Sequence, residues 1–378
     1  MTHSHKIAFL FLDEIHHVNH FVSVAVALAE KNEVHILTYP GKHSYLRNAL
    51  QKLQGEKVIV EELKTLPFRA FTDKLKKREL PRKGFWLKKN MKYLLHNFDA
   101  LIFTDFFHRY VLDARHNKTK PKLIKFTHGT PGRGYTFKND MVEFDFQLLP
   151  GNFYKQLLEE KNLLAQNYAV VGYPKLDAVQ RKETPDFFSN NKPIILYNPH
   201  FAEPLSSWHL WGLKLLDWFY HQNTYNLIFA PHINLFEHKG GASPETIPEK
   251  YFKAEHMHID LGSEESVDMT YIMAADLYLG DVSSQVYEFI TTPRPCVFLN
   301  PQQIDHAKDV KFRFWKCGPV LTAVEALPSS LENAFEDFNK FKSVQEHITS
   351  ENYYTEEGSS PSQRAAKAIT AYLDTTSL

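Results

Sequence analysis

Short, nearly continuous apolar runs alternate with longer amphipathic segments along the chain, and this alternation constrains the fold more than any other feature. The runs of the first half are KIAFLFL (6–12), VHILTY (34–39), KVIVEEL (57–63), ALIFTD (100–105), KLIKFTH (122–128), FQLLPG (146–151) and YAVVGYP (168–174). Amphipathic segments at 18–31, 85–97 and 153–161 separate some of them. Parallel strands that helices cover on both faces have this apolar character. The pattern predicts βαβ units and a doubly wound sheet.

A polar stretch with turn-forming residues, QRKETPDFFSNNK (180–192), interrupts the alternation and is interpreted as a linker. A second series follows, with strand-like runs at 193–200, 225–232, 256–262, 276–284 and 295–300 and helical patterns at 207–222 and 267–276. The chain of 378 residues is long enough for two domains. We therefore predict two Rossmann-like domains in tandem, 1–180 and 181–378.

The bulk composition indicates a soluble globular protein without an overall charge bias. Hydrophobic residues make up 43% of the chain, and 44 basic residues balance 44 acidic ones, so no nucleic-acid partner is expected. Cys296 and Cys317 show no CxxC spacing and are expected to be free thiols in a reducing compartment. No apolar stretch reaches the roughly 18–20 residues of a membrane span, and the first apolar run is too short for a signal peptide. A cytoplasmic location is the expectation.

Basic residues cluster between Lys64 and Lys92, where eleven lysines and arginines face only Asp73 and Glu79. Aromatic and leucine side chains lie between them. Two interpretations are open. The segment is either a solvated helical face, or a surface that docks on an anionic membrane or polymer. The second would place the protein at the inner face of the membrane as a peripheral protein.

Polar side chains follow many of the predicted strands at the point where each strand ends. These are His16 and His17, His128, Tyr173, His200, His232, and the group Asp281, Ser283 and Ser284. Ligands of open α/β sheets bind beyond the carboxyl ends of the strands. If both sheets turn these ends toward one cleft, the binding site lies between the domains.

The segment GDVSSQVYEF (280–289) is the clearest anion-site candidate. A predicted strand ends at Gly280, and Ser283 and Ser284 stand at a helix start. Free backbone N–H groups and the helix dipole favour an anion there, and two hydroxyls add donors. Glu288, one turn later, can accept hydrogen bonds from ribose hydroxyls. A simple helix cap with a surface glutamate is the alternative.

His232, in IFAPHIN, can donate to a phosphate oxygen, and His200, in YNPHF, offers the same chemistry. Each can equally be a structural histidine at a strand end. His238, His256 and His258 add imidazoles, but no HExxH or CxxC spacing accompanies them, so we expect neither a metal nor another cofactor. The absence of GxSxG, P-loop and GxGxxG patterns weighs against hydrolase, NTPase and ordinary dehydrogenase functions.

Several ordered segments resemble the CDP-glycerol glycerophosphotransferases of teichoic-acid and capsule synthesis. The segments are KFTHGTPGRG (125–134), VVGYPKLD (170–177), ILYNPHF (195–201), GDVSSQVYEFITTPRPCVFL (280–299) and EEGSSPSQRAAKAI (356–369). The resemblance implies a GT-B fold, in which two Rossmann-like domains face an interdomain cleft and the C-terminal helix returns to the N-terminal domain. It also implies that domain 1–180 holds the acceptor and domain 181–378 the nucleotide donor.

The chain departs from the family pattern at Gly132-Arg133, at Pro231-His232 and at His200-Phe201. These departures leave the donor open between CDP-glycerol, CDP-ribitol and a nucleotide sugar. A second resemblance, of 16–39 to the opening of GT-B glycosyltransferases, makes His17 an alternative catalytic base.

The resemblance implies that an acceptor hydroxyl attacks the distal phosphorus of the donor and that CMP leaves. His128 is then the base, because imidazole has a suitable pKa near neutrality. His232, Ser283 and Ser284 would hold the pyrophosphate, and Glu288 the ribose. The remaining predicted substrate contacts are Gly129, Thr130, Arg133, His200 and Asp281.

Four functions are thus compared. The first is transfer of an alditol phosphate from a CDP-activated donor to a cell-surface polymer or its lipid-linked precursor. The second is a GT-B glycosyltransferase with His17 as base. The others are nucleotide binding without turnover and a GT-B epimerase, for which the spacing of Ser283 and Glu288 is a loose match.

Overall fold

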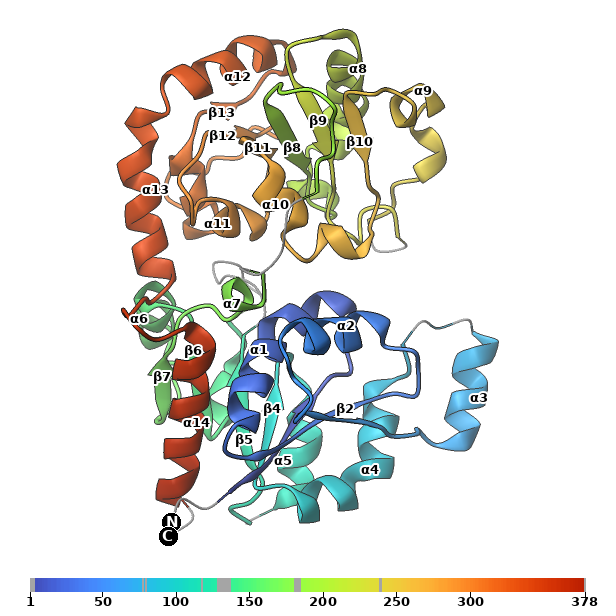
Figure 1. Ribbon diagram of the computed structural model, residues 1–378, viewed down its shortest axis with the longest axis vertical. Coiled ribbons are helices and arrows are strands. Elements are labelled where there is room, and N and C mark those ends of the chain that lie inside the picture. The colour runs from blue at the N-terminus through green and yellow to red at the C-terminus, as the bar shows by residue number, and fades with distance from the viewer. Residues whose placement is uncertain are drawn as a thin grey trace. The chain divides into compact units, whose positions relative to one another are not determined.

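The computed structural model describes residues 4–76, 78, 80–116, 118–127, 137–179, 185–237 and 240–376. By its internal contacts the chain divides into two compact units. Unit 1 combines Met1–Arg181 with Glu351–Leu378, and unit 2 is Lys182–Ser350. Each unit contains a parallel sheet with helices between successive strands (Figure 1). The predicted fold class, α/β with two Rossmann-like units, is confirmed.

Unit 1 is built on a parallel sheet in the order β3-β2-β1-β4-β5-β6-β7. Its strands are β1 (Lys6–Leu10), β2 (Glu33–Thr38), β3 (Ile59–Glu62), β4 (Ala100–Phe103), β5 (Lys122–Phe126), β6 (Phe146–Leu149) and β7 (Tyr168–Val170). The central strand β1 pairs with β2 and β4, so that Phe9 lies opposite Ile36 and Ile102. Six of the seven strands fall within the predicted apolar runs, and β2 begins one residue before its predicted run, at Glu33.

Helices cover both faces of this sheet. The α-helices of unit 1 are α1 (Val18–Ala29), α2 (Ser44–Lys52), α3 (Pro67–Leu75), α4 (Lys83–Asn97), α5 (Arg109–Arg115), α6 (Asn152–Glu160), α7 (Lys175–Val179) and α14 (Pro361–Thr376). Ile7 and Phe9 of β1 pack with α1 and α14, whereas Ala8 and Leu10 pack with α4 and α5. Because successive side chains of a strand point to opposite faces, this division is the structural basis of the continuous apolar run.

Unit 2 repeats the arrangement with the strand order β10-β9-β8-β11-β12-β13. Its strands are β8 (Ile194–Asn198), β9 (Asn226–Phe229), β10 (Met257–Ile259), β11 (Leu277–Gly280), β12 (Cys296–Leu299) and β13 (Val320–Leu321). Its helices are α8 (Leu213–His221), α9 (Glu249–Phe252), α10 (Thr270–Ala274), α11 (Gln285–Phe289), α12 (Leu327–Glu336) and α13 (Asn339–Asn352), the last of which leads back to unit 1.

The predicted helix at 207–222 consists of two parts, a π-helical turn at Trp208–Gly212 and the regular helix α8. A side chain at Gly212 would meet the ring of Trp208, since an added Cβ would lie only 2.2 Å from its nearest ring atom. The predicted helix at 267–276 is shorter than expected. Met269 has a left-handed backbone (φ 67°), so α10 begins only at Thr270.

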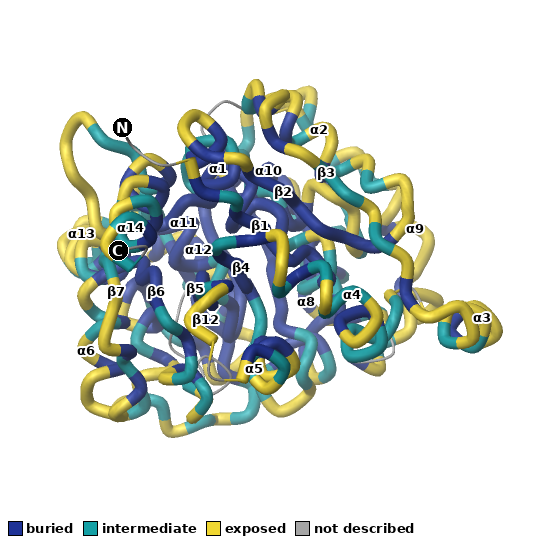
Figure 2. The backbone as a smooth tube through the Cα atoms, turned by 90° about the horizontal axis from the view of Figure 1, so that it is seen from below, coloured by how far each residue is buried: buried dark blue, intermediate teal, exposed yellow. Residues whose placement is uncertain are grey.

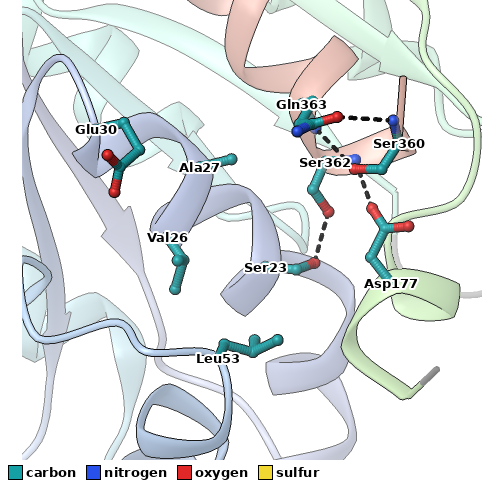
Figure 3. A pocket seen from close by; sticks show the side chains of 9 residues that line it. All are labelled: Ser23, Val26, Ala27, Glu30, Leu53, Asp177, Ser360, Ser362 and Gln363. Carbon is teal, nitrogen blue, oxygen red and sulfur yellow. Dashed lines mark hydrogen bonds between the residues drawn. The ribbon is translucent and has the colours of Figure 1, made fainter. Parts of the chain in front are cut away.

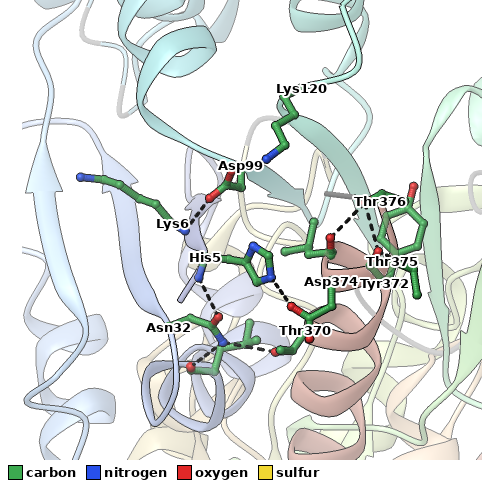
Figure 4. A network of polar contacts seen from close by, with 12 residues as sticks. His5, Lys6, Asn32, Asp99, Lys120, Thr370, Tyr372, Asp374, Thr375 and Thr376 are labelled. Carbon is green, nitrogen blue, oxygen red and sulfur yellow. Dashed lines mark hydrogen bonds and ion pairs between the residues drawn. The ribbon is translucent and has the colours of Figure 1, made fainter. Parts of the chain in front are cut away.

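The C-terminal helix α14 returns to unit 1, as the family resemblance implies. His5 Nε2 lies 2.7 Å from the Asp374 carboxylate, and Asn32 donates to Thr370 Oγ1 at 3.2 Å (Figure 4). The rings of Phe146 and Tyr372 stack with centroids 4.5 Å apart. The core of unit 1 therefore includes residues from both ends of the chain.

Burial follows this layered plan, with the central strands buried and the outward faces of the helices exposed (Figure 2). Within the described ranges, no helix has both the length and the apolar character that a membrane crossing needs.

Candidate active site

Asp281 is the polar centre of the carboxyl edge of the second sheet. It follows β11 directly and is fully buried. One carboxylate oxygen accepts from the backbone N–H groups of His200 (2.8 Å) and Val282 (2.6 Å). The other accepts from the N–H (2.5 Å) and hydroxyl (2.7 Å) of Ser207. Burial raises the pKa of Asp281, and these donors oppose the rise. Asp281 thus holds the loop after β8 in place, and its predicted contact with substrate stays a prediction.

His200 and His232 lie side by side at this edge, with ring centroids 5.7 Å apart. Nδ1 of His200 accepts the N–H of Ala202 at 3.0 Å, and Nδ1 of His232 accepts the N–H of Asn234 at 3.2 Å. A ring nitrogen that accepts a hydrogen bond carries no proton, so the neutral form of each ring is protonated at Nε2. The backbone therefore orients both imidazoles as Nε2–H donors, which suits a phosphate oxygen as partner.

Ser283 and Ser284 precede the short helix α11, as predicted. Ser284 is the N-cap residue, and Ser283 Oγ accepts the N–H of Gln285 at 3.2 Å. Glu288 is only 2% exposed. The alternative of a surface glutamate at this position is therefore wrong. The roles of these three residues toward a nucleotide stay predictions.

The carboxyl edge of the first sheet carries His17, one of the two candidate bases. The side chain is buried, and its Nδ1 lies 3.0 Å from the hydroxyl of Thr104, which directly follows β4. The other candidate, His128, lies outside the described residues, as do Gly129, Thr130 and Arg133.

Three charged residues at this edge were not singled out from the sequence. Asp13 and Asp105 follow β1 and β4, and the ammonium of Lys83 forms ion pairs with both, at 2.9 Å to Asp105. Burial raises the pKa of Asp13 to about 6, although Lys83 opposes this. Burial would also raise the pKa of Asp105, but Lys83 lowers it below its ordinary value. Both carboxylates end apolar runs, so the strand-end rule applied to acids would have found them.

Lys125 is a further charged residue that the sequence interpretation missed. Its position in β5 leaves the side chain only 1% exposed, and Nζ donates to the carbonyl oxygens of Thr104 (2.7 Å) and Phe126 (3.3 Å). Nζ also lies over the ring of Phe106, 4.4 Å from the centroid. Burial lowers the pKa of Lys125 to about 7. An apolar run that contains a lysine near its carboxyl end was the available signal.

We expect Lys125 to make stability depend on pH. Because its pKa falls from 10.5 in water to about 7 in the fold, the unfolded chain binds one more proton between these values. Stability from this group therefore rises with pH in that window, by about 1.4 kcal/mol per pH unit. Lys125→Met removes the dependence. In urea unfolding at pH 7.5 and 9.5, the stability of the variant relative to wild type should fall by about 2–3 kcal/mol. An unchanged difference would contradict the burial argument.

Among the described residues, two groups of side chains have the composition and spacing of metal ligands. Glu14, His16 and His17 form one, and His108, Asp140 and Glu143 form the other. In the second group Arg109 donates to both carboxylate oxygens of Glu143, at 2.9 and 2.7 Å, and His108 Nε2 lies 3.0 Å from the same carboxylate. These contacts form an ion-pair network, in which the guanidinium of Arg109 already binds the carboxylate of Glu143.

A cavity of about 210 Å³ lies between α1, α7 and α14 of unit 1 (Figure 3). The Ser362 hydroxyl donates to Ser23 Oγ (2.8 Å), which donates to the carbonyl of Pro174 (3.1 Å). Among the described residues, the lining of the cavity contains the carboxylates Glu30 and Asp177 but no lysine, arginine or histidine. The two carboxylates repel an anion, and the hydroxyls of Ser23 and Ser362 already donate within the protein. The cavity is therefore a poor site for a phosphorylated ligand.

A model of the family described as CDP-glycerol:poly(glycerophosphate) glycerophosphotransferase matches residues 69–371, which is most of the chain. The chain belongs to this glycerophosphotransferase family. This match confirms the predicted family, and with it the predicted class of enzyme and of activity. No curated protein sequence matches the chain.

Several solved structures share this fold at low sequence identity. The wall teichoic acid polymerase TagF is 13% identical, with a TM-score of 0.63 over 98% of this chain and 88% of that one. MnaA of S. aureus with UDP is 13% identical, with a TM-score of 0.61 over 98% and 97%. A UDP-GlcNAc 2-epimerase of Neisseria meningitidis is 12% identical, with a TM-score of 0.59 over 97% and 99%. These likenesses show the GT-B type of fold.

Two segments that carry the glycerophosphotransferase resemblance meet inside unit 1. Gly172, in the Gly-Tyr-Pro segment, has a φ of 91°, and an added Cβ would lie 2.5 Å from the carbonyl oxygen of Tyr354. Arg364, in the closing segment, donates to the carbonyl oxygens of Val171 (2.9 Å) and Tyr354 (3.0 Å). These motif residues join β7 to the returning C-terminal segment, so their contacts here serve the fold.

Proposed function

We propose that this glycerophosphotransferase transfers glycerol phosphate from CDP-glycerol to a hydroxyl of a cell-surface polymer or its lipid-linked precursor. The observation that carries the proposal is the pair His200 and His232, whose Nδ1 atoms accept backbone N–H groups. The pair offers two oriented Nε2–H donors without requiring a net positive charge. A diphosphate, with several acceptor oxygens in a row, is a fitting partner.

In the proposed reaction the acceptor oxygen attacks the distal phosphorus of CDP-glycerol. A new P–O bond forms to the acceptor, and the bond from that phosphorus to the bridging oxygen breaks, so that CMP leaves with the electron pair. His128 takes the acceptor proton. Such a transfer depends chiefly on alignment and on neutralisation of charge. His232, Ser283 and Ser284 stabilise the leaving phosphate, and Arg133 contacts the transferred one.

The remaining contacts follow from the same proposal. Glu288 holds the ribose, and His200, Asp281, Gly129 and Thr130 complete the substrate contacts. Unit 2 then serves as the donor unit and residues 1–180 as the acceptor domain. We place the protein in the cytoplasm, at the inner face of the membrane, where a lipid-linked acceptor is available. Cys296 and Cys317 are both buried free thiols, in keeping with a reducing compartment.

A nucleotide-binding experiment tests the donor class. A ligand at a hundredfold its Kd adds about 2.7 kcal/mol to stability, which shifts the melting temperature measurably. We expect CMP and CDP-glycerol to stabilise the protein more than UDP or a UDP-sugar does. His232→Ala should weaken CMP binding roughly tenfold, as expected for one lost hydrogen bond to a charged group. His221→Ala, an exposed histidine in the same unit, should change nothing.

The turnover measurement is release of CMP from CDP-glycerol in the presence of acceptor. Stabilisation by UDP but not by CMP would replace the proposal with the glycosyltransferase alternative, in which His17 is the base. The observation that favours this alternative is the contact of His17 Nδ1 with the hydroxyl of Thr104. Normal CMP binding without product from any CDP-alditol would indicate a nucleotide-binding protein.

A further inference from the structure

Helix α3 is inverted relative to an ordinary surface helix. Phe68, Phe71 and Leu75 lie on one face of the helix, and their side chains are 68%, 64% and 74% exposed. The buried residue of the helix is instead the acid Asp73, at 5% exposure. An amphipathic helix of a soluble protein normally buries its apolar face and exposes its charges. A contiguous exposed apolar face of this kind marks an interaction surface.

The inversion is built into the fold by specific contacts. Asp73 accepts from Arg82 Nε at 2.8 Å, and Arg82 also donates to Thr72 Oγ1 at 2.9 Å. Arg82 immediately precedes α4, whose Trp86 is fully buried. The ion pair therefore ties the polar side of α3 to an anchored helix and leaves the apolar side outward. In both views α3 stands out from the rest of unit 1 (Figures 1 and 2).

Exposed basic residues lie within α3 and on either side of it in the sequence. Lys64, Lys74, Lys76 and Arg78 are all exposed in the described part of the segment. The one acid described there, Asp73, is neutralised by its ion pair with Arg82. Among the charged residues of the exposed surface described in 64–78, every one is a cation.

We propose that α3 docks on an anionic lipid bilayer, with Phe68, Phe71 and Leu75 inserted at the interface and the flanking cations against lipid phosphates. This deepens the proposed function by naming the surface that brings the enzyme to a membrane-borne acceptor. An apolar face with basic residues on its borders is the pattern of interfacial helices. Cations near an anionic leaflet add electrostatic attraction.

The chemistry of the face favours a bilayer over other occupants. A second copy of the same surface would bring its cations against those of the first. A soluble polyanion would satisfy the cations but leave the three apolar side chains in water. A bilayer with anionic headgroups satisfies both the charged and the apolar part.

Sedimentation of the full chain with lipid vesicles tests the proposal without any substrate. We expect binding to vesicles of phosphatidylcholine with phosphatidylglycerol and little binding to phosphatidylcholine alone. The variant F68S/F71S/L75S should lose at least about tenfold in partitioning, because three apolar side chains no longer enter the interface. The control L210S/L213S/F252S removes three exposed apolar side chains of unit 2 and should bind like wild type.

Two further measurements separate the possible outcomes. Lys74→Gln with Lys76→Gln should weaken binding most at low salt, since exposed charges are screened as salt rises. Undiminished vesicle binding by F68S/F71S/L75S would overturn the proposal. Binding of soluble poly(glycerol phosphate) that is lost in the same variant would also overturn it, in favour of a polymer site.

Turnover with a water-soluble acceptor distinguishes this proposal from the proposed function. The variant F68S/F71S/L75S should keep wild-type turnover in that assay. If wild type binds vesicles yet releases no CMP, the transferase proposal fails and the docking surface stands. If it releases CMP but ignores anionic vesicles, the docking proposal fails alone.

Discussion

His128→Ala is expected to lower CMP release from CDP-glycerol by about 10²–10⁴-fold, the usual contribution of a general base. Nucleotide affinity should stay at the wild-type level, because the donors proposed to hold the nucleotide lie in unit 2. The melting temperature should also be unchanged. A further sign is the pH profile, in which the acid limb that reflects deprotonation of the base should disappear.

Two comparisons make the His128 result specific. His96→Ala replaces an exposed histidine of α4 whose Nδ1 bonds only locally to the carbonyl of Lys92, and it should leave turnover unchanged. His17→Gln changes the alternative base. Full turnover in His128→Ala together with loss in His17→Gln would transfer the catalytic role to His17 and support the glycosyltransferase alternative.

Asp281→Ala is expected to lower the unfolding free energy of unit 2 by about 3–5 kcal/mol. The change removes the acceptor of the backbone N–H groups of His200, Ser207 and Val282 and leaves them buried without that partner. Each unpaired buried donor costs about 1–3 kcal/mol. Urea unfolding and thermal melting both measure the loss. CMP affinity should fall too, since His200 loses the bond that positions its backbone.

Milder substitutions calibrate this effect. Asp281→Asn keeps one carbonyl oxygen for His200 and Val282 but turns a donor toward Ser207, so we expect about half the loss. Asp309→Ala removes a carboxylate that accepts a single N–H, from Lys311, at a helix start in the same unit. That variant should cost about 1 kcal/mol. Equal stability losses in Asp281→Ala and Asp309→Ala would contradict this prediction. They would show that the several bonds of Asp281 stabilise the unit no more than one bond at a helix start.

All strands except the short β13 (Val320–Leu321), and their order of appearance, could be predicted, because apolar runs between amphipathic segments leave few other folds. Helix ends were less accessible. Gly212 must avoid the ring of Trp208, and that contact exists only after the segment has coiled. The edge residues of unit 2 were found from their places after strands. The hydrogen bonds of Asp281 to the backbone could not be predicted. No pattern in the sequence distinguishes an acid that binds a ligand from one that binds backbone N–H groups of its own chain.

Lys125 shows a second limit of sequence reasoning. Its run, KLIKFTH, is counted as a strand because of its apolar residues Leu123, Ile124 and Phe126. A lysine within such a run is commonly placed at the surface. Only the pairing of β5 between β4 and β6 makes the side chain buried. Likewise, the basic segment 64–92 stands out in the sequence by its charge, whereas the outward direction of Phe68 and Phe71 depends on the pair of Asp73 with Arg82.

The return of α14 makes unit 2 an insertion within unit 1, and this has a consequence for the order in which the chain folds during synthesis. Unit 2 is a continuous stretch, Lys182–Ser350, so it can fold as soon as it leaves the ribosome. Unit 1 cannot, because Ile369 and Leu373 of α14 belong to the same core as Val22 of α1. Its N-terminal part must remain partly open, with apolar surface exposed, until the last helix has been made. The half of the protein that is translated first is therefore the half that is completed last.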